Sequence, residues 1–184
     1  MNRANLLGFG IDKYTIDELK NLADKGQVVT INPEIIEYAL KNPDFAKIIQ
    51  DAEYVIPDGI GVQLGLALIG EKIKRIAGID FAKQMLNKFE TKPVALIGAK
   101  PHVIENAVKN LKKELPNLNI IYTQNGYFDD EEKILKETIE KNPKLVLVAL
   151  GSPKQEEFIY KLKNKLPETL MRSEEHTSEL QSRS

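Results

Sequence analysis

The sequence has no cysteine, and it has only two histidines among its 184 residues. Without cysteine the chain can form no disulfide, no thiolate metal site and no cysteine nucleophile. His102 has no second ligand at a metal-binding spacing, and no Asp-x-Asp pair is present to hold a metal together with a diphosphate. We therefore expect a protein that works without a metal or another cofactor.

Charge of one sign is not in excess either. Lys and Arg number 26 and Asp and Glu number 27, so the formal net charge is −1. Such a chain has no global positive field to attract nucleic acid over a distance. We expect no nucleic-acid partner, and any phosphate site must be built locally.

Long hydrophobic runs are also absent. The longest weakly polar stretch, Gly59 to Gly70, is well short of the roughly 20 residues that span a bilayer. The first residues carry one basic side chain and a short apolar run that Gly8 and Gly10 interrupt, which does not make a signal peptide. These features favour a soluble cytoplasmic protein.

Several glycine and serine signatures are missing as well. No Gly-x-Gly-x-x-Gly follows a strand, no phosphate-loop Gly-Lys-Ser/Thr occurs, and there is no serine elbow. Gly59, Gly61 and Gly65 have the wrong spacing for a dinucleotide-binding turn. This weakens the hypothesis of an oxidoreductase on a dinucleotide fold.

What is present is a regular alternation of apolar runs and amphipathic stretches, typical of a parallel α/β sheet. Strands are expected at residues 27–31, 54–56, 94–97, 119–122 and 145–150, with a weaker candidate at 6–9. The runs at 94–97 and 145–150 are continuously apolar, which indicates central strands covered on both faces. We expect one α/β domain with a Rossmann-like, mostly parallel sheet and helices on both faces.

Helix boundaries are marked by capping residues. Thr15 with Glu18 forms a capping box, and Asn32 precedes a proline suited to a first turn. Residues 129–132 are acidic and predict another helix start, and Asn142 followed by Pro143 ends that helix. Gly26 is expected to close the first helix.

The far end is interpreted separately. Residues 172–182 resemble the translation of a sequencing adapter. We therefore expect the domain to occupy residues 1–170 and to be incomplete at its C-terminus, with residues 171–184 forming a non-native, disordered tail.

Four polar clusters follow expected strands, where open α/β sheets bind their ligands. They are residues 30–33, 57–61, 124–128 and 151–156. The cluster at 151–156 is a strand-to-helix turn whose backbone N–H groups, next to Lys154, could hold a diphosphate, although an ordinary helix start explains it as well. Asp58 is a candidate functional carboxylate or the carboxylate of an Asx turn.

The remaining candidates also have two interpretations. Thr30 and Asn32 are two residues apart and can present a hydroxyl and an amide to one ligand, but Asn32 is also the best cap for the next helix. Tyr127 and Phe128 could offer an aromatic face to a base, or they could be core aromatics after a glycine turn.

Taken in order, the segments at 30–34, 57–61, 75–80, 126–128 and 151–156 make the chain resemble the WecG/TagA/CpsF glycosyltransferases from about Leu6 to about Leu166. The resemblance implies inverting, metal-independent transfer of N-acetylmannosamine or a related sugar. The donor would be a UDP-sugar and the acceptor an undecaprenyl-diphosphate-linked sugar, for cell-wall or surface polysaccharide.

The resemblance also implies residue roles. Asp58 matches the proposed catalytic base, with Thr30 as catalytic support and Asn32 beside it. Arg75 fits a phosphate clamp, because guanidinium recognises phosphate through two hydrogen bonds, although it could be a surface arginine in a basic stretch. Nucleotide-side contacts fall on further residues, which are Tyr127, Gly151, Ser152, Lys154 and Gln155.

Full-length relatives continue into at least one more strand and a basic appendage that meets the membrane. We therefore expect a whole protein at the inner face of the membrane, and an inactive or nearly inactive chain here. A nucleotide-binding α/β module without catalysis is the alternative, and Asp58 discriminates the two, since a binding module needs no carboxylate at the acceptor side.

Overall fold

The computed structural model describes residues 3–74, 76 and 78–174. Its centre is a six-stranded sheet in the order β4-β3-β8-β7-β5-β6, and every neighbouring pair is parallel. The strands are β3 (Gly26–Ile31), β4 (Tyr54–Pro57), β5 (Val94–Gly98), β6 (Ile120–Gln124), β7 (Leu145–Ala149) and β8 (Leu170–Ser173). The expected Rossmann-like α/β class is confirmed, and β5 and β7 are interior strands as predicted.

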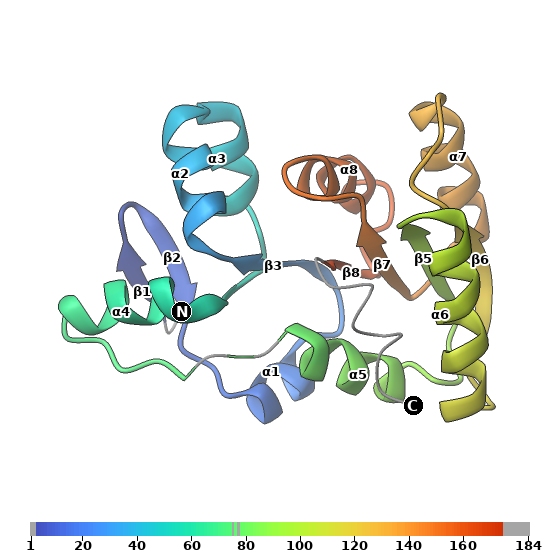
Figure 1. Ribbon diagram of the computed structural model, residues 1–184, viewed down its shortest axis with the longest axis horizontal. Helices are drawn as coiled ribbons and strands as arrows, with labels where there is room; N and C mark the ends of the chain where they lie inside the picture. Colours follow the sequence, from blue (N-terminus) through green and yellow to red (C-terminus); the bar gives the residue numbers. More distant parts are fainter. Residues whose placement is uncertain (1–2, 75, 77, 175–184) are drawn as a thin grey trace.

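Helices cover both faces of this sheet (Figure 1). One face carries α2 (Pro33–Lys41), α3 (Pro43–Gln50), α7 (Glu131–Lys141) and α8 (Lys154–Lys163). The other face carries α1 (Ile16–Leu22), α5 (Gly78–Lys88) and α6 (Pro101–Glu114). Alternate strand residues supply the two cores, since Val28 packs with the α1 and α5 side and Val29 with the α2 and α3 side.

A separate antiparallel hairpin lies beside the sheet, made of β1 (Arg3–Leu6) and β2 (Phe9–Asp12). The strand expected at residues 6–9 was therefore wrong. Leu7 and Gly8 have φ values of 54° and 91°, and two consecutive positive φ angles make a tight hairpin turn. The Asp12 carboxylate fixes the hairpin, because it pairs with Arg3 at 2.8 Å and accepts from the Val55 N–H at 2.7 Å.

The capping predictions are largely confirmed. Thr15 and Glu18 form the capping box of α1, Asn32 accepts from the Ile35 N–H at 2.8 Å, and Asp130 accepts from the Lys133 N–H at 2.9 Å. Gly26 has a different role from the expected one. The α1 helix already ends at Leu22, and Gly26 opens β3 with a φ of +95°.

The structure differs from the expectation of a sheet without its closing strand. Leu170–Ser173 forms β8 in the middle of the sheet, paired with β3 on one side and β7 on the other. Leu170 and Met171 are fully buried. Without this segment β3 and β7 would each leave a buried row of backbone groups unpaired, so the sheet favours a strand in that position. The rest of the expected tail, residues 175–184, lies outside the described residues.

Candidate active site

All six strands of the sheet run in the same direction, so their carboxyl ends meet at one edge. Asp58 follows β4, Asn32 follows β3, the turn at 150–153 follows β7, and the loop with Tyr127 follows β6. The sheet order places the first two side by side, and it separates them from the other two by β8. The predicted site residues therefore fall into two groups along a single edge.

The first group centres on Thr30 and Asp58. β3 and β4 are in register at Ile31 and Pro57, and the Asp58 N–H donates to the Ile31 carbonyl at 2.9 Å. Both side chains line one small crevice, together with Gly78, Ile79 and the end of β8 (residues 172–174). The structure thus brings the predicted base and its predicted hydroxyl partner into one space.

Thr30 is buried, with 5% of its surface exposed, and its hydroxyl oxygen has no hydrogen-bond partner among the described residues. A buried polar group without a partner costs about 1–3 kcal/mol, so such groups usually meet a ligand or water. The interpretation of Thr30 as an ordinary strand residue does not explain this hydroxyl. A polar group of a ligand in the crevice would satisfy it.

Asp58 and Asn32 both act as helix caps as well. Asp58 precedes α4 (Gly59–Leu68), and its Oδ1 accepts from the Gly59 N–H at 2.8 Å. Asn32 caps α2 through the bond to Ile35. The capping interpretations of both residues are therefore present in the structure. For Asp58 the cap also orients the carboxylate, which is 8% exposed, at the mouth of the crevice.

Arg172 is the cationic residue among the described residues that line this crevice. It is 1% exposed, its guanidinium lies 5.1 Å from the Phe81 ring centre, and its Nη1 is 3.3 Å from a Glu174 carboxylate oxygen. Its Nε and Nη1 have no partner with hydrogen-bond geometry among the described residues. Burial lowers the pKa of Arg172, and the negative charges of Glu174 and Asp58 oppose that shift. The guanidinium of Arg172 therefore lies buried beside the candidate base, where removing its charge from water costs free energy.

The predicted phosphate clamp, Arg75, lies outside the described residues. The described part of the same motif begins α5, and Gly78 of this motif lines the crevice of Thr30 and Asp58. A Cβ atom on Gly78 would lie 2.9 Å from the Arg172 Nη2. The described part of this motif therefore reaches the first group at Gly78.

The second group is built around the turn between β7 and α8. Gly151 has a φ of +77°, and its N–H donates to the Gln155 side chain at 3.2 Å. The α8 helix has no side-chain cap at its start. Gly151, Ser152 and Lys154 are exposed. An uncapped helix start with an exposed lysine is suited to an anionic ligand, and the ordinary helix-cap interpretation is not what this turn shows.

The two aromatic residues of the β6 loop differ. Phe128 packs on Phe158, with ring centres 6.3 Å apart, and Lys154 Nζ lies 4.7 Å above its ring. Tyr127 is 70% exposed and lines a pocket with Lys100 and Leu150. The core interpretation therefore holds for Phe128, whereas Tyr127 borders the site. Phe128 also ties the lysine of the turn to the β6 loop.

One residue that sequence reasoning missed lies within the second group, where the neighbouring strands β5 and β7 end. The helix after β5 packs on one face of the sheet and the helix after β7 on the other, which makes this the point where ligands bind in open α/β sheets. Gly98 has a φ of +120°, and a Cβ there would lie 2.2 Å from the Ala149 carbonyl oxygen. A glycine directly after the apolar run at 94–97 was the available signal.

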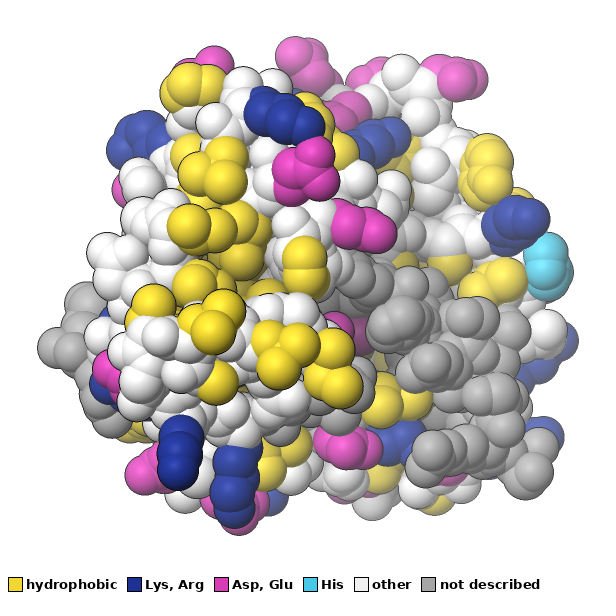
Figure 2. Space-filling view, turned by 60° about the vertical axis from the view of Figure 1, so that its left-hand side comes forward, with side chains coloured by type: hydrophobic (Ala, Val, Ile, Leu, Met, Phe, Trp, Pro, Cys, Tyr) yellow, Lys and Arg dark blue, Asp and Glu magenta, His cyan; other side chains and the backbone are white. Residues whose placement is uncertain are grey.

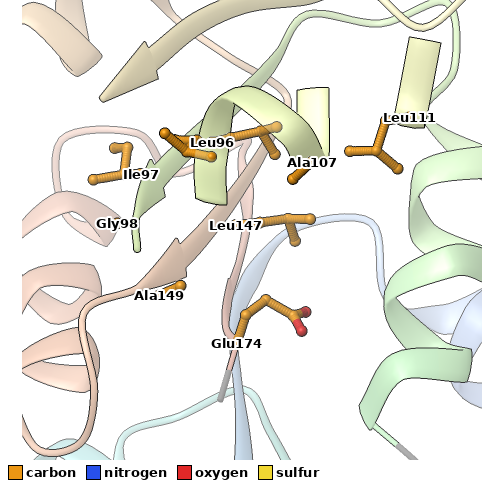
Figure 3. Close-up of a pocket in the computed structure, with 9 residues that line it drawn as sticks. Leu96, Ile97, Gly98, Ala107, Leu111, Leu147, Ala149 and Glu174 are labelled. Carbon is orange, nitrogen blue, oxygen red and sulfur yellow. The ribbon is translucent and has the colours of Figure 1, made fainter. Parts of the chain in front are cut away.

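An apolar crevice lies beneath this point, between α6 and the ends of β5 and β7 (Figure 3). Its described walls come from Leu96 and Leu147 of the sheet and from Ala107 and Leu111 of α6. Ala149 borders both this crevice and the outer pocket of Tyr127 and Lys100. The end of β7 thus has an apolar space on one side and a polar, cationic one on the other.

Glu156 is the second residue that was missed as a site candidate. It is fully buried, and neither carboxylate oxygen has a hydrogen-bond partner among the described residues. Burial raises the pKa of its carboxyl, and the nearby Ser152, Gln155 and Ser173 partly offset that rise. Gln155 is also fully buried, with its Nε2 unpartnered among the described residues. The helical spacing of Phe158, Ile159 and Leu162 could have indicated that this face is buried.

Comparison with known proteins assigns the chain to a family. The family model "Glycosyl transferase WecG/TagA/CpsF family" matches residues 4–173. The chain belongs to this family. The match includes both groups of site residues and extends through β8.

Curated relatives bear the name N-acetylglucosaminyldiphosphoundecaprenol N-acetyl-β-D-mannosaminyltransferase. The one from Bacillus spizizenii is 36% identical over 146 residues, which are 78% of this chain and 57% of the relative. The one from Bacillus subtilis is 35% identical over 165 residues, 87% of this chain and 62% of the relative. The one from Staphylococcus aureus strain NCTC 8325 is 32% identical over 148 residues, 78% of this chain and 58% of the relative. The chain therefore spans about three-fifths of the length of these relatives.

Proposed function

We propose that the protein of this chain transfers N-acetylmannosamine from a UDP-sugar to N-acetylglucosamine on an undecaprenyl-diphosphate lipid, with inversion and without a metal. The observation that carries the proposal is the shared crevice of Asp58 and Thr30 at the carboxyl edge of the sheet. The family membership and the names of the relatives support the substrates.

In the proposed reaction Asp58 is the general base. Its carboxylate takes the proton from the acceptor hydroxyl while that oxygen attacks the anomeric carbon of the donor. The bond between the anomeric carbon and the UDP oxygen breaks, and the electron pair leaves with UDP. A single displacement of this kind inverts the configuration at the anomeric carbon.

Thr30 and Asn32 orient the reacting groups in this proposal. The Thr30 hydroxyl is buried in the crevice and donates to or accepts from a sugar hydroxyl. Asn32 follows the same strand and stabilises the start of α2, so its contribution includes holding the backbone beside Asp58 in place.

The leaving UDP is held at the second group. The exposed Ser152 and Lys154 meet the diphosphate, and Tyr127 faces the uracil ring. Gln155 is buried and accepts from the Gly151 N–H, so these two residues hold the shape of the turn and do not touch the ligand. Arg75 is proposed as a further phosphate contact. Positive groups placed where negative charge develops stabilise the departure of UDP without a metal ion.

The test uses this chain and a version extended by the C-terminal region of the Bacillus subtilis relative. A panel of UDP-sugars is offered with a short-chain diphospholipid acceptor, and UDP binding is measured separately. We expect UDP binding by both proteins, and turnover with UDP-N-acetylmannosamine by the extended protein only, because the relatives continue beyond the matched region. We expect a chelator to leave the turnover of the extended protein unchanged.

Other results would contradict the proposal in defined ways. UDP binding without turnover of any donor by the extended protein would favour a nucleotide-binding module. Activity that chelator abolishes and magnesium or manganese restores would overturn the metal-independent mechanism. Equal turnover by the two proteins would show that the matched region already holds the complete machinery.

A further inference from the structure

The α4 helix directly follows the candidate base and has an unusual surface. From Gly59 to Gly70 the sequence contains no charged residue. Ile60, Leu64 and Leu68 are four residues apart and are 75%, 61% and 88% exposed. Residues four apart lie on one side of a helix, so these three form a continuous apolar row that faces outward. We call this row the α4 stripe.

The opposite side of α4 is packed, so its orientation is fixed. Val62 and Leu66 are fully buried, at 1% and 0% exposure. Gly61 approaches Pro33 so closely that a Cβ would lie 2.6 Å from its ring, and Gly65 approaches Leu6 in a similar way. Larger side chains at these two glycines would push the helix off the hairpin and α2. The α4 stripe is therefore exposed by a well-packed helix.

Further apolar side chains extend the α4 stripe. Leu7 of the hairpin turn, Leu40 of α2 and Ile69 are 63%, 58% and 51% exposed. An apolar groove runs between the hairpin, α2 and α4, with Leu7, Leu40 and Gly61 among its lining residues. Figure 2 shows hydrophobic side chains gathered on this side of the molecule. Contiguous apolar surface of this kind marks a site that contacts a protein or a membrane.

The charges that border the α4 stripe have both signs, but the acidic ones are paired: Glu37, which lines the apolar groove, forms an ion pair with Lys41. Lys72 and Lys74 follow the helix, are exposed, and have no ion-pair partner among the described residues. The one acid between the stripe and these lysines, Glu71, is already paired with Lys13 at 2.6 Å. Apolar residues next to lysines that have no acidic partner within the described part of the chain are complementary to an anionic bilayer surface, where each lysine contributes about 1 kcal/mol.

The length of α4 determines what kind of contact it can make. Ten residues of helix measure about 15 Å, half of what a bilayer core requires. No helix of the described residues is long and apolar enough to cross a membrane. At a bilayer, a helix of this length that is apolar on both sides lies in the surface plane, with its exposed side among the headgroups. A second copy of the chain fits less well, because the stretch 59–70 has no acid to meet the lysines.

We propose that the α4 stripe is a membrane-docking surface that inserts at the headgroup level of an anionic bilayer. The purpose of this contact rests on the proposed function. The Asp58 carboxylate caps α4, so docking of the stripe sets the crevice beside the membrane surface. A diphosphate on a polyprenyl lipid lies at that same depth. Docking would therefore bring the acceptor to the base without moving it out of the bilayer.

The experiment uses the full chain and vesicles that contain neither acceptor nor donor. Co-sedimentation is measured with vesicles of phosphatidylcholine alone and of phosphatidylcholine mixed with phosphatidylglycerol. The parent chain should bind the mixed vesicles more tightly. Leu64→Ser and Leu68→Ser should each weaken that binding roughly tenfold, in line with the loss of one buried leucine. Lys72→Gln with Lys74→Gln should remove most of the preference for phosphatidylglycerol.

Leu22→Ser is the matched control, because Leu22 is 49% exposed on α1, away from the stripe. Thermal unfolding verifies that each variant folds, and Leu68, at 88% exposure, gives a variant that leaves the core untouched. Unchanged vesicle binding by the stripe variants, or no vesicle binding by the parent, would overturn the proposal. A dimer that Leu64→Ser dissociates, with no vesicle binding, would assign the stripe to a second copy instead.

The vesicle experiment and the turnover experiment can fail independently of each other. Vesicle binding requires no sugar transfer, so loss of turnover in the extended protein leaves the docking result unaffected. Conversely, stripe substitutions made in the extended protein should leave its turnover of a water-soluble short-chain acceptor unchanged, because none of the three side chains lines the crevice of Thr30 and Asp58.

Discussion

The two halves of the carboxyl edge differ in how closed they are. On the β3–β4 side, formed by Thr30, Asn32 and Asp58, the threonine and aspartate are 5% and 8% exposed and share one small crevice. On the β7–α8 turn, residues 150–154, the glycine, serine and lysine are exposed, and the neighbouring Tyr127 is 70% exposed. One half is enclosed before any ligand arrives, whereas the other is open.

This difference separates two tasks. A base works best where its position is fixed and water is limited, which the enclosed β3–β4 side provides. A diphosphate must enter and leave in every cycle, and an open helix start with a flexible lysine allows that exchange. The comparison predicts that changes on the β3–β4 side affect rate, and changes on the β7–α8 turn affect donor affinity.

The largest expected effect comes from Asp58→Asn in the extended protein. Turnover should fall by roughly 100-fold to 10,000-fold, the range for loss of a general base, with little change in UDP binding. Asparagine caps a helix about as well as aspartate, so the stability of α4 should be kept. Steady-state rates and UDP titrations measure the two effects, and Asp17→Asn on the exposed side of α1 is the control. Near-normal turnover would remove Asp58 from the role.

The next effect concerns the buried ion pair that fills the enclosed half. Replacing Arg172 and Glu174 together by leucine should raise the free energy of unfolding by about 1–4 kcal/mol, because apolar residues avoid the desolvation of two buried charges. Arg172 already lacks hydrogen-bond partners for two nitrogens among the described residues. Urea unfolding of the chain measures the difference. A less stable double variant would mean that the pair is well compensated.

A smaller effect is expected on the open half. Lys154→Ala should weaken UDP binding about tenfold, the loss of one charge-assisted contact, while turnover at saturating donor changes less. Lys165→Ala, an exposed lysine just beyond the same helix, is the matched control. A fall in turnover without a change in UDP affinity would show that Lys154 acts in the chemical step, as predicted for the β3–β4 side.

The smallest effect is a pH dependence at Glu156, which lies under the β7–α8 turn. Its pKa is raised by burial above the ordinary 4.5, so its contribution to stability is complete below that value and is lost as pH rises through the folded-state pKa. Glu156→Gln should therefore gain stability relative to the parent as pH increases from about 4 to about 8. Urea unfolding at several pH values measures this. Parallel pH profiles for the two proteins would contradict it.

Much of the fold could be predicted, because its signals are local. The apolar runs at 94–97 and 145–150 indicated interior strands, and the caps at Thr15 and Asn32 marked helix starts. The hairpin at the N-terminus was missed, since two four-residue strands carry little periodicity. β8 was missed because residues 171–184 were interpreted as a non-native tail, and only pairing with β3 and β7 places a strand there.

The candidate site also contains residues with local sequence signals and residues whose role depends on tertiary packing. Thr30 and Asp58 could be selected because they follow strands and match a family motif, and adjacent strands bring them together. The capping roles of Asp58 and Asn32 are local and were foreseen as alternatives. Gly98 and Glu156 carried only weak sequence signals, a glycine after an apolar run and a helical spacing. Their significance depends on an approach to Ala149 and on burial under the β7–α8 turn, which arise from tertiary packing.

The central position of β8 also affects how the chain folds during its synthesis on the ribosome. Synthesis delivers β3 and β4 early and β5, β6 and β7 later, but the two sets touch through a strand that emerges after all of them. Until then each half carries an open strand edge, able to pair with another nascent chain. The sheet is thus completed late, by contacts between residues that are far apart in the sequence. Chaperones that shield open strand edges should matter most before β8 has been synthesised.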